Sequence, residues 1–297
     1  MKPRFECLKC LLTVRLKELE CAGGSNVEKL EVAKKVIIKL IEDFNFNYEL
    51  TRLATNLYKY LITLAPSVVD YYKSLKRSLN QLALRDLKVH DEYVSRLSDY
   101  ERFRYLVKLS ALGNLIDYGV AEHVPTSGLI EPQTVVEYEV AVDHISDLYE
   151  MVSGGGLKIA WLFDNAGEAV YDTLLIRELR RLGNRVIGFM KSEPGFQNDL
   201  TIEDAVEIGL DKILDRVVSY GARSTIHLED VDEEVLKAIN EADLIVAKGM
   251  SNYENLIDVE LEKPIFFILI PKCSPVASSI GKGSKGKIVV KRKEKAP

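Results

Sequence analysis

One stretch, residues 157–168 (LKIAWLFDNAGE), constrains the fold of this chain more than any other. Its apolar run at 159–163 predicts a buried strand. The run gives way at once to Asp164 and Asn165, and apolar residues then recur at helical spacing over 169–182. A strand that ends in polar side chains and passes into a helix is typical of an open α/β sheet, in which ligands bind beyond the carboxyl ends of the strands. We therefore expect a ligand site at this strand end.

The chain after Gly156 alternates short apolar runs with helical stripes. This alternation predicts parallel strands joined by crossover helices. Further strands are expected at 185–189, 216–219, 244–247 and 264–270, a last edge strand at 287–290, and helices at 202–208 and 233–240.

The pattern before residue 120 is helical instead. Apolar residues recur at i, i+3, i+4 and i+7 in 27–44, 49–64, 68–84 and 100–112. Pro66 separates two of these stripes, because proline rarely continues a helix. We therefore divide the chain into a helical subdomain or cap (1–120), a connecting segment (121–156) and an α/β domain (157–297) that carries the site.

Composition excludes several classes of protein. Of the 297 residues, 47% are hydrophobic and 29% are charged, as in an ordinary globular protein. A formal net charge of -5 disfavours broad nucleic-acid binding. No apolar run reaches the roughly 18 to 20 residues of a membrane span, and the N-terminus lacks the uninterrupted apolar region of a signal peptide. We expect a cytoplasmic protein without nucleic-acid or membrane partners.

The cysteines gather near the N-terminus, where Cys7, Cys10 and Cys21 lie, and only Cys273 is distant. A C-x-x-C pair in a cytosolic chain is typical of a metal or redox site. A complete zinc site needs four ligands, and no second pair of this kind follows. A second metal or a dithiol at Cys7 and Cys10 therefore stays open beside the alternative of reduced, partly buried thiols.

Polar residues follow three of the predicted strands. They are Asp164, Asn165 and Glu168 after the first, Lys191, Asn198 and Asp199 after the second, and Lys248, Ser251, Asn252 and Glu254 after the fourth. The ends of parallel strands share one edge of a sheet, so these side chains are expected to converge. Carboxylate and amide oxygens suit Mg²⁺ or Mn²⁺, and a lysine supplies a point charge for phosphate. The combination predicts metal-assisted phosphoryl chemistry, although Asp, Asn and Ser also form caps and turns after strands.

A break in the helical pattern at Gly113 brings Asn114 and Asp117. It predicts either a helix C-cap with a turn or a segment that carries both side chains into the site. Other signatures are missing: there is no G-x-x-x-x-G-K-[ST] phosphate loop, no G-x-S-x-G serine elbow and no H-E-x-x-H zinc helix.

These segments together resemble the damage-control metal phosphatases. The resemblance rests on GNLID (113–117), DNAGE (164–168), KSEPGFQND (191–199), AKGMSNYE (247–254) and PKC (271–273), which occur in the family's order over nearly the whole chain. The N-terminal C-x-x-C is similar to that of the family's microbial branch.

The resemblance implies a helical subdomain packed on a Rossmann-like, three-layer α/β domain with a mostly parallel sheet. It also implies a divalent metal (Mg, Mn, Co or Ni) and hydrolysis of phosphate monoesters of sugars or damaged metabolites. Carried over by position, the metal ligands would be Asp164, Asn165 and Asp199, and Lys248 would bind phosphate. Glu168 would take part in catalysis. The residues expected at the substrate are Asn114, Asp117, Lys191, Ser251, Asn252 and Glu254.

Two mechanisms and two other functions stay open. Asp164 would attack phosphorus itself, through an aspartyl-phosphate, or assist a water activated by the metal; both need an ionised carboxylate, and we favour Asp164 as nucleophile as well as ligand. The other functions are a protein-carboxylate methyltransferase that uses S-adenosylmethionine and a non-catalytic phosphometabolite-binding protein. The physiological substrate, the native metal and the oligomeric state are left open by the sequence.

Overall fold

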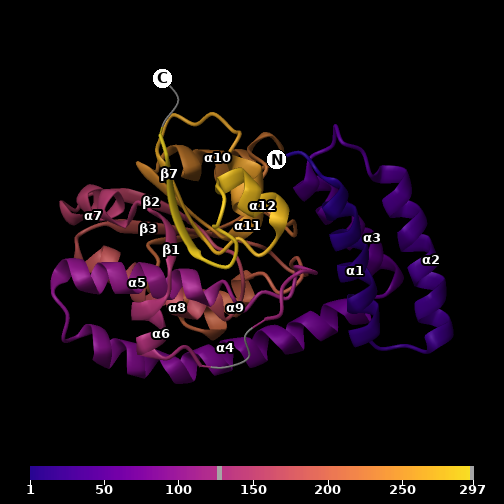
Figure 1. The fold of residues 1–297 in the computed structure, drawn as a ribbon, viewed down its shortest axis with the longest axis horizontal. Helices are drawn as coiled ribbons and strands as arrows, with labels where there is room; N and C mark the ends of the chain where they lie inside the picture. Colours follow the sequence, from indigo (N-terminus) through magenta and orange to yellow (C-terminus); the bar gives the residue numbers. More distant parts are fainter. Residues whose placement is uncertain (126–128, 295–297) are drawn as a thin grey trace.

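A seven-stranded sheet forms the centre of the computed structural model, which describes residues 1–125 and 129–294 (Figure 1). Part of the predicted connecting segment and the last residues of the predicted α/β domain lie outside the described residues. The strands are β1 Val140–Asp143, β2 Lys158–Leu162, β3 Arg185–Met190, β4 Arg216–Ser219, β5 Leu244–Lys248, β6 Ile265–Leu269 and β7 Ile288–Lys293. Their order is β1-β7-β6-β5-β2-β3-β4, and neighbours run parallel except β6 and β7. The predicted mostly parallel α/β sheet is confirmed.

One end of the sheet differs from the prediction. The sequence predicts an edge strand at 287–290, but β7 lies inside the sheet, parallel to β1 and antiparallel to β6. The edge strand is β1, which falls in the segment predicted to connect the two domains. Its apolar run is only three residues long (140–142), and its four residues alternate between partly buried and exposed, so the signal for a strand is weak. Because β1 covers β7 on one side, Ile288, Val289 and Val290 are buried.

Most predicted helical stripes match helices within about one residue at each end, but the helix predicted at 68–84 continues to residue 94, and several helices lie outside the predicted stripes. The helices are α1 Phe5–Cys21, α2 Asn26–Asp43, α3 Leu50–Leu64, α4 Ser67–Val94, α5 Asp99–Gly113, α6 Pro132–Glu137, α7 Ile145–Ser153, α8 Glu168–Arg181, α9 Ile202–Glu207, α10 Glu233–Asn240, α11 Gly249–Leu256 and α12 Ser274–Ile280, with short 3-10 turns η1 Leu210–Lys212 and η2 Leu228–Asp230. A capping box of Ser25 and Glu28 begins α2. Among the described residues, no helix combines the length and the apolar character that crossing a membrane requires.

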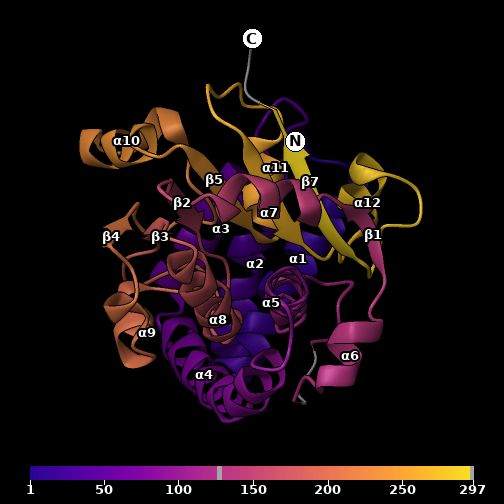
Figure 2. The ribbon, with the colours of Figure 1, turned by 90° about the vertical axis from the view of Figure 1, so that its left-hand side faces the viewer.

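Helices cover both faces of the sheet, which gives three layers. Buried residues of α5, α7 and α8 and of the second half of α4 pack with one set of strand side chains, among them Trp161 and Val246. Figure 2 shows α4, α5 and α8 on the same side of the sheet. The opposite set of strand side chains, such as Leu162 and Phe267, packs with α10, α11 and α12. The sheet is therefore buried on both faces, as parallel sheets generally are.

A separate helical layer stands beside this three-layer core. Helices α1, α2, α3 and the first half of α4 share a core of their own, which includes Leu57, Leu61 and Tyr72. Figure 1 shows α1, α2 and α3 beside the α/β part, with α4 running from one to the other. Phe196, from the segment after β3, packs into this helical core. The first third of the chain thus contributes to two hydrophobic cores; the boundary near residue 120 stays a prediction.

Candidate active site

A cavity of about 110 Å³ lies where the helical layer meets the carboxyl ends of the strands. Residues from both parts of the chain line it. Those that the sequence predicts as site residues are Asp117, Asp164, Asn165, Asp199, Ser251 and Glu254. The strand ends after β2 and β3 and the start of α11 therefore converge, as the prediction requires.

Backbone pairing brings Asp164, Asn165 and Asp199 together. Asn165 and Asp199 form an isolated antiparallel bridge, and the backbone N–H of Leu200 donates to the carbonyl oxygen of Asp164 at 2.8 Å. The Asn165 side chain donates through Nδ2 to Oδ2 of Asp164 at 2.9 Å, and its Oδ1 accepts from Asn198 at 3.0 Å. The side chains of these residues are thus held in fixed orientations before any ligand binds.

Two carboxylates are buried here, and among the described residues only Asp199 forms an ion pair. Burial, followed by the charges of Glu168 and Asp199, raises the pKa of Asp164 well above its usual value. Burial also raises the pKa of Asp199 to about 6, although Lys191 Nζ lies 2.8 Å from its Oδ2 and acts in the opposite direction. Two carboxylates and an amide oxygen are hard donors of the type that Mg²⁺ and Mn²⁺ prefer. The donor set therefore fits a divalent cation, which would offset the excess negative charge.

Glycine at position 249 makes room for the Asp164 carboxylate. Gly249 begins α11 with φ +76°, and a Cβ built on it would lie 1.8 Å from Asp164 Oδ2. Neither this φ nor this approach suits a residue with a side chain. The sequence prediction passed over this glycine, which the motif AKGMSNYE contains.

We expect Gly249→Ala to displace Asp164 and to lower activity by roughly a hundredfold, since a shift of about 1 Å at a catalytic group can have an effect of this size. The free energy of unfolding should fall as well, because alanine is strained at positive φ. Steady-state kinetics and urea unfolding measure the two effects. Gly154→Ala is the control, because a Cβ at Gly154 meets no atom within 4 Å; equal losses in both variants would contradict the close-approach argument.

Lys248 lies behind the cavity wall rather than on it. Its Nζ is fully buried and lies 2.8 Å from Glu168 Oε1, 2.7 Å from Asp172 Oδ1 and 2.7 Å from Ser110 Oγ. Burial disfavours the charged lysine, but Asp172 and Glu168 outweigh it and raise the pKa of Lys248. Asn114 joins this group to the cavity, because its Nδ2 donates to Asp164 at 2.9 Å and to Glu168 at 2.8 Å.

Asp172 is a buried site-associated residue that the sequence prediction missed. Burial raises its pKa to about 6 despite the neighbouring Lys248. It lies one helical turn after Glu168, so the two acids share a face of α8. An acid on the otherwise apolar face of a helix was the signal that could have found it.

Two other predicted residues, Asn252 and Asp117, form buried polar contacts that connect segments around the cavity. Asn252 Nδ2 donates to the carbonyl oxygens of Lys248 and Phe163 at 2.8 and 3.3 Å, which ties α11 to two strand ends. Asp117 pairs with Lys272 at 2.8 Å, so its pKa is held below its usual value in spite of burial. The predicted residues that do not line the cavity are Asn114, Glu168, Lys191, Asn198, Lys248 and Asn252.

Three cysteines from opposite ends of the chain also line the cavity. Cys7, Cys10 and Cys273 are all free thiols. Burial raises the pKa of Cys10 to about 11 and that of Cys273 to about 12, so both thiols are protonated at neutral pH. A second metal or dithiol at Cys7 and Cys10 stays a prediction, to which the structure adds that Cys273 lies at the same cavity.

Glu254 gives the protein a specific pH dependence. Burial raises its pKa from 4.5 to about 7, partly offset by the N-terminal amino group. The native state thus holds this proton more tightly than the unfolded state, so the stabilisation is fully present below about pH 4.5 and is lost as the pH rises through 7. Glu254→Gln should match the wild type near pH 4.5 and exceed its free energy of unfolding by about 1–2 kcal/mol at pH 8. Urea unfolding across this pH range measures the difference in free energy of unfolding, with exposed Glu42→Gln as control. A difference that does not change with pH would contradict the raised pKa of Glu254.

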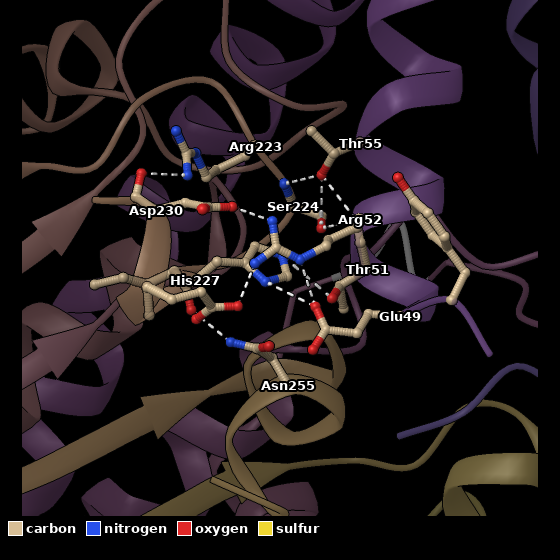
Figure 3. A network of polar contacts seen from close by, with 12 residues as sticks. Glu49, Thr51, Arg52, Thr55, Arg223, Ser224, His227, Asp230 and Asn255 are labelled. Carbon is tan, nitrogen blue, oxygen red and sulfur yellow. Dashed lines mark hydrogen bonds and ion pairs between the residues drawn. The ribbon is translucent and has the colours of Figure 1, made fainter. Parts of the chain in front are cut away.

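A second acidic cluster lies where α3 meets the segment before η2 (Figure 3). Among the described residues, Glu49, His227 and Glu229 offer ligand atoms within 4.8 Å of one another. Arg52 already forms ion pairs with both of these glutamates and with Asp230. The cluster is therefore an ion-pair network that links the helical layer to the α/β part, in which Arg52 already offsets part of the charge of three carboxylates.

Comparisons with known proteins place the chain in a family. Residues 5–288 match the family described as the damage-control phosphatase ARMT1-like domain. A damage-control phosphatase of Archaeoglobus fulgidus is 35% identical over 82% of both chains. An uncharacterized protein of Methanocaldococcus jannaschii is 30% identical over 98% of this chain and 96% of its own.

A solved structure extends the likeness to the fold. The crystal structure of a DUF89 family protein from Pyrococcus horikoshii matches with a TM-score of 0.84 and 28% identity, over 98% of this chain and 99% of the other. A damage-control phosphatase of the same organism is 29% identical over 98% of both chains. The chain therefore belongs to the damage-control phosphatase ARMT1-like domain family.

Proposed function

We propose that this chain is a divalent-metal-dependent phosphatase that hydrolyses phosphate monoesters of sugars or damaged metabolites. The observation that carries the proposal is the pair of buried carboxylates, Asp164 and Asp199, with the Asn165 amide at one cavity. Family membership supports phosphatase chemistry, and a phosphatase of this kind takes a small phosphorylated substrate.

Asp164, Asn165 and Asp199 would hold the metal, which would neutralise charge on the phosphoryl group when bound. The neighbouring amide side chains orient the Asp164 carboxylate. Asn114 and Asn165 both donate to Oδ2 of Asp164, and neither bond uses Oδ1. Oδ1 is thus the oxygen we assign as nucleophile: it would form a bond to phosphorus as the ester P–O bond breaks, and the departing oxygen would take a proton from water. A second water would then release inorganic phosphate and regenerate the carboxylate.

We assign Lys248 a positioning role. Its Nζ is engaged by Glu168, Asp172 and Ser110, so a direct contact with phosphate would require it to leave at least one of them. Through Glu168 and Asn114 it instead supports the orientation of Asp164. The other predicted contacts to substrate fall to Asp117, Ser251 and Glu254, which line the cavity.

The test is a screen of phosphate esters with protein that has been stripped of metal and then given Mg²⁺, Mn²⁺, Co²⁺ or Ni²⁺. Metal-dependent release of inorganic phosphate is expected for some esters. Trapping with a fluoroberyllate tests the nucleophile, since an aspartyl-phosphate analogue formed on Asp164 indicates the covalent route. Absence of release with every metal contradicts the proposal, and tight binding of esters without turnover would indicate a binding protein instead.

A further inference from the structure

Arg15 is the one lysine or arginine that lines the cavity within the described part of the chain. It comes from α1, in the helical layer, and its side chain is almost fully buried. The remaining charged residues of the lining are acids, namely Glu6, Asp117, Glu122, Asp164, Asp199 and Glu254. Arg15 is thus the single basic residue in the wall of this cavity among the described residues, and an anionic substrate would reach its guanidinium after a small shift of the side chains around it.

The guanidinium group of Arg15 is held in one orientation. Its Nε and Nη2 lie 2.8 Å and 2.9 Å from the two carboxylate oxygens of Glu18, which is a bidentate ion pair. The guanidinium carbon also lies 5.1 Å from the ring centre of Tyr58 and 6.0 Å from that of Phe196. Glu18 is itself fixed by bonds from Tyr72 at 2.7 Å and Gln197 at 3.0 Å. Little conformational freedom is left to lose when a ligand binds.

The far edge of the same guanidinium is unused. Nη1 of Arg15 is buried and has no hydrogen-bond partner among the described residues. Leaving a buried charged donor unpaired is costly, and native proteins rarely do so without a ligand or water. A rigid, planar donor edge is also the geometry that suits the oxygens of a phosphate.

The Arg15–Glu18 pair contacts the segment of the chain that contains Asp199, a candidate metal ligand. Gln197, which donates to Glu18, precedes Asp199 by two residues and has a positive φ of 50°. Phe196, beside the guanidinium, belongs to the same segment. The segment that places Asp199 is thus also packed against the Arg15–Glu18 pair.

We propose that Nη1 of Arg15 binds the phosphoryl oxygens of the substrate, so that the helical layer supplies the phosphate-binding cation. This inference rests on the proposed phosphatase function and adds a residue to it. Glu18 has the role of orienting the guanidinium, and the acids around the cavity favour the metal-bound, phosphorylated ligand over a bare anion.

Calorimetric titration with inorganic phosphate, in the presence of Mn²⁺, tests the proposal without requiring turnover. Arg15→Lys keeps the charge that balances Glu18 but lacks the second donor edge, so the phosphate Kd should rise by about 10- to 100-fold, the range for losing a hydrogen bond to a charged group. The double variant Arg15→Gln/Glu18→Gln removes the pair as a neutral unit and should lose at least as much affinity. Exposed Arg85→Gln is the matched control and should bind phosphate as the wild type does.

Circular dichroism and urea unfolding confirm that each variant is folded before titration. An unchanged Kd in folded Arg15→Lys and in the folded double variant overturns the assignment, as does a wild type that binds no phosphate with metal. A variant in which KM for an ester rises while phosphate Kd stays constant also overturns it, because the contact then lies elsewhere on the substrate. Ester hydrolysis by the wild type is measured separately, so failure of the phosphatase proposal is distinguishable from failure of this one.

Discussion

Asp164→Asn is expected to lower the rate of metal-dependent ester hydrolysis by at least about 1000-fold. The change keeps the size of the side chain but removes the negative charge and the nucleophilic oxygen. Asparagine would also bring a third amide into a place where Asn114 and Asn165 already donate to Oδ2. Both the affinity for the metal and the rate of attack on phosphorus should therefore fall.

The measurement is kcat/KM for the best ester of the screen, with metal affinity determined by calorimetry. Asp91→Asn, an exposed aspartate on α4, is the matched control and should retain full activity. Retention of more than about a tenth of wild-type kcat/KM by Asp164→Asn would rule out Asp164 as nucleophile. Weaker metal binding with the same kcat at saturating metal would leave it a ligand only.

The sequence predicts the central strands and most helices because each carries its own hydrophobic signal. The strands predicted at 185–189 and 244–247 differ from β3 and β5 by one residue at one end. The prediction was wrong about β1 and about the position of β7, because these two strands are recognised only through their pairing with each other. β1 is short and half exposed, so only its pairing with β7 marks it as a strand. Without β1, the position of β7 inside the sheet cannot be deduced from residues 287–290 alone.

Some residues of the candidate site can likewise be predicted from the sequence, and others depend on tertiary packing. Asp164 and Asn165 stand just beyond the end of β2, where ligands bind in an open parallel sheet. Asp199 lies nine residues beyond the end of β3, and the loop between them brings it to its bridge with Asn165. Which lysine faces the cavity depends on packing between distant segments. Lys248 is the last residue of β5, yet Ser110 from α5 and Asp172 from α8 enclose it. In the sequence, Arg15 is one of several charges on a helix, and nothing there predicts its place at the cavity. The tertiary structure brings it to the strand ends.

Lys248→Met should lower the free energy of unfolding by about 3–5 kcal/mol, the range for removing one partner of a buried ion pair. Glu168 and Asp172 are both fully buried and would be left without their cation. Methionine approximates the length and volume of the lysine stem, so the lost charge rather than a cavity should dominate. Urea unfolding at constant pH measures the change, and exposed Lys237→Met on α10 should remain within about 0.5 kcal/mol of the wild type.

The same variant separates the two roles considered for Lys248. If it holds Glu168 and Asn114 in place, Lys248→Met combined with Asp172→Asn should recover part of the lost stability, because one of the two unpaired carboxylates is gone. Activity per folded molecule should fall mainly through kcat, since Asp164 loses its orientation while phosphate binding by Arg15 persists. If Lys248 instead contacts phosphate, the single variant should keep nearly its full stability and show a raised phosphate Kd. The burial of all three charged groups leads us to expect the first result.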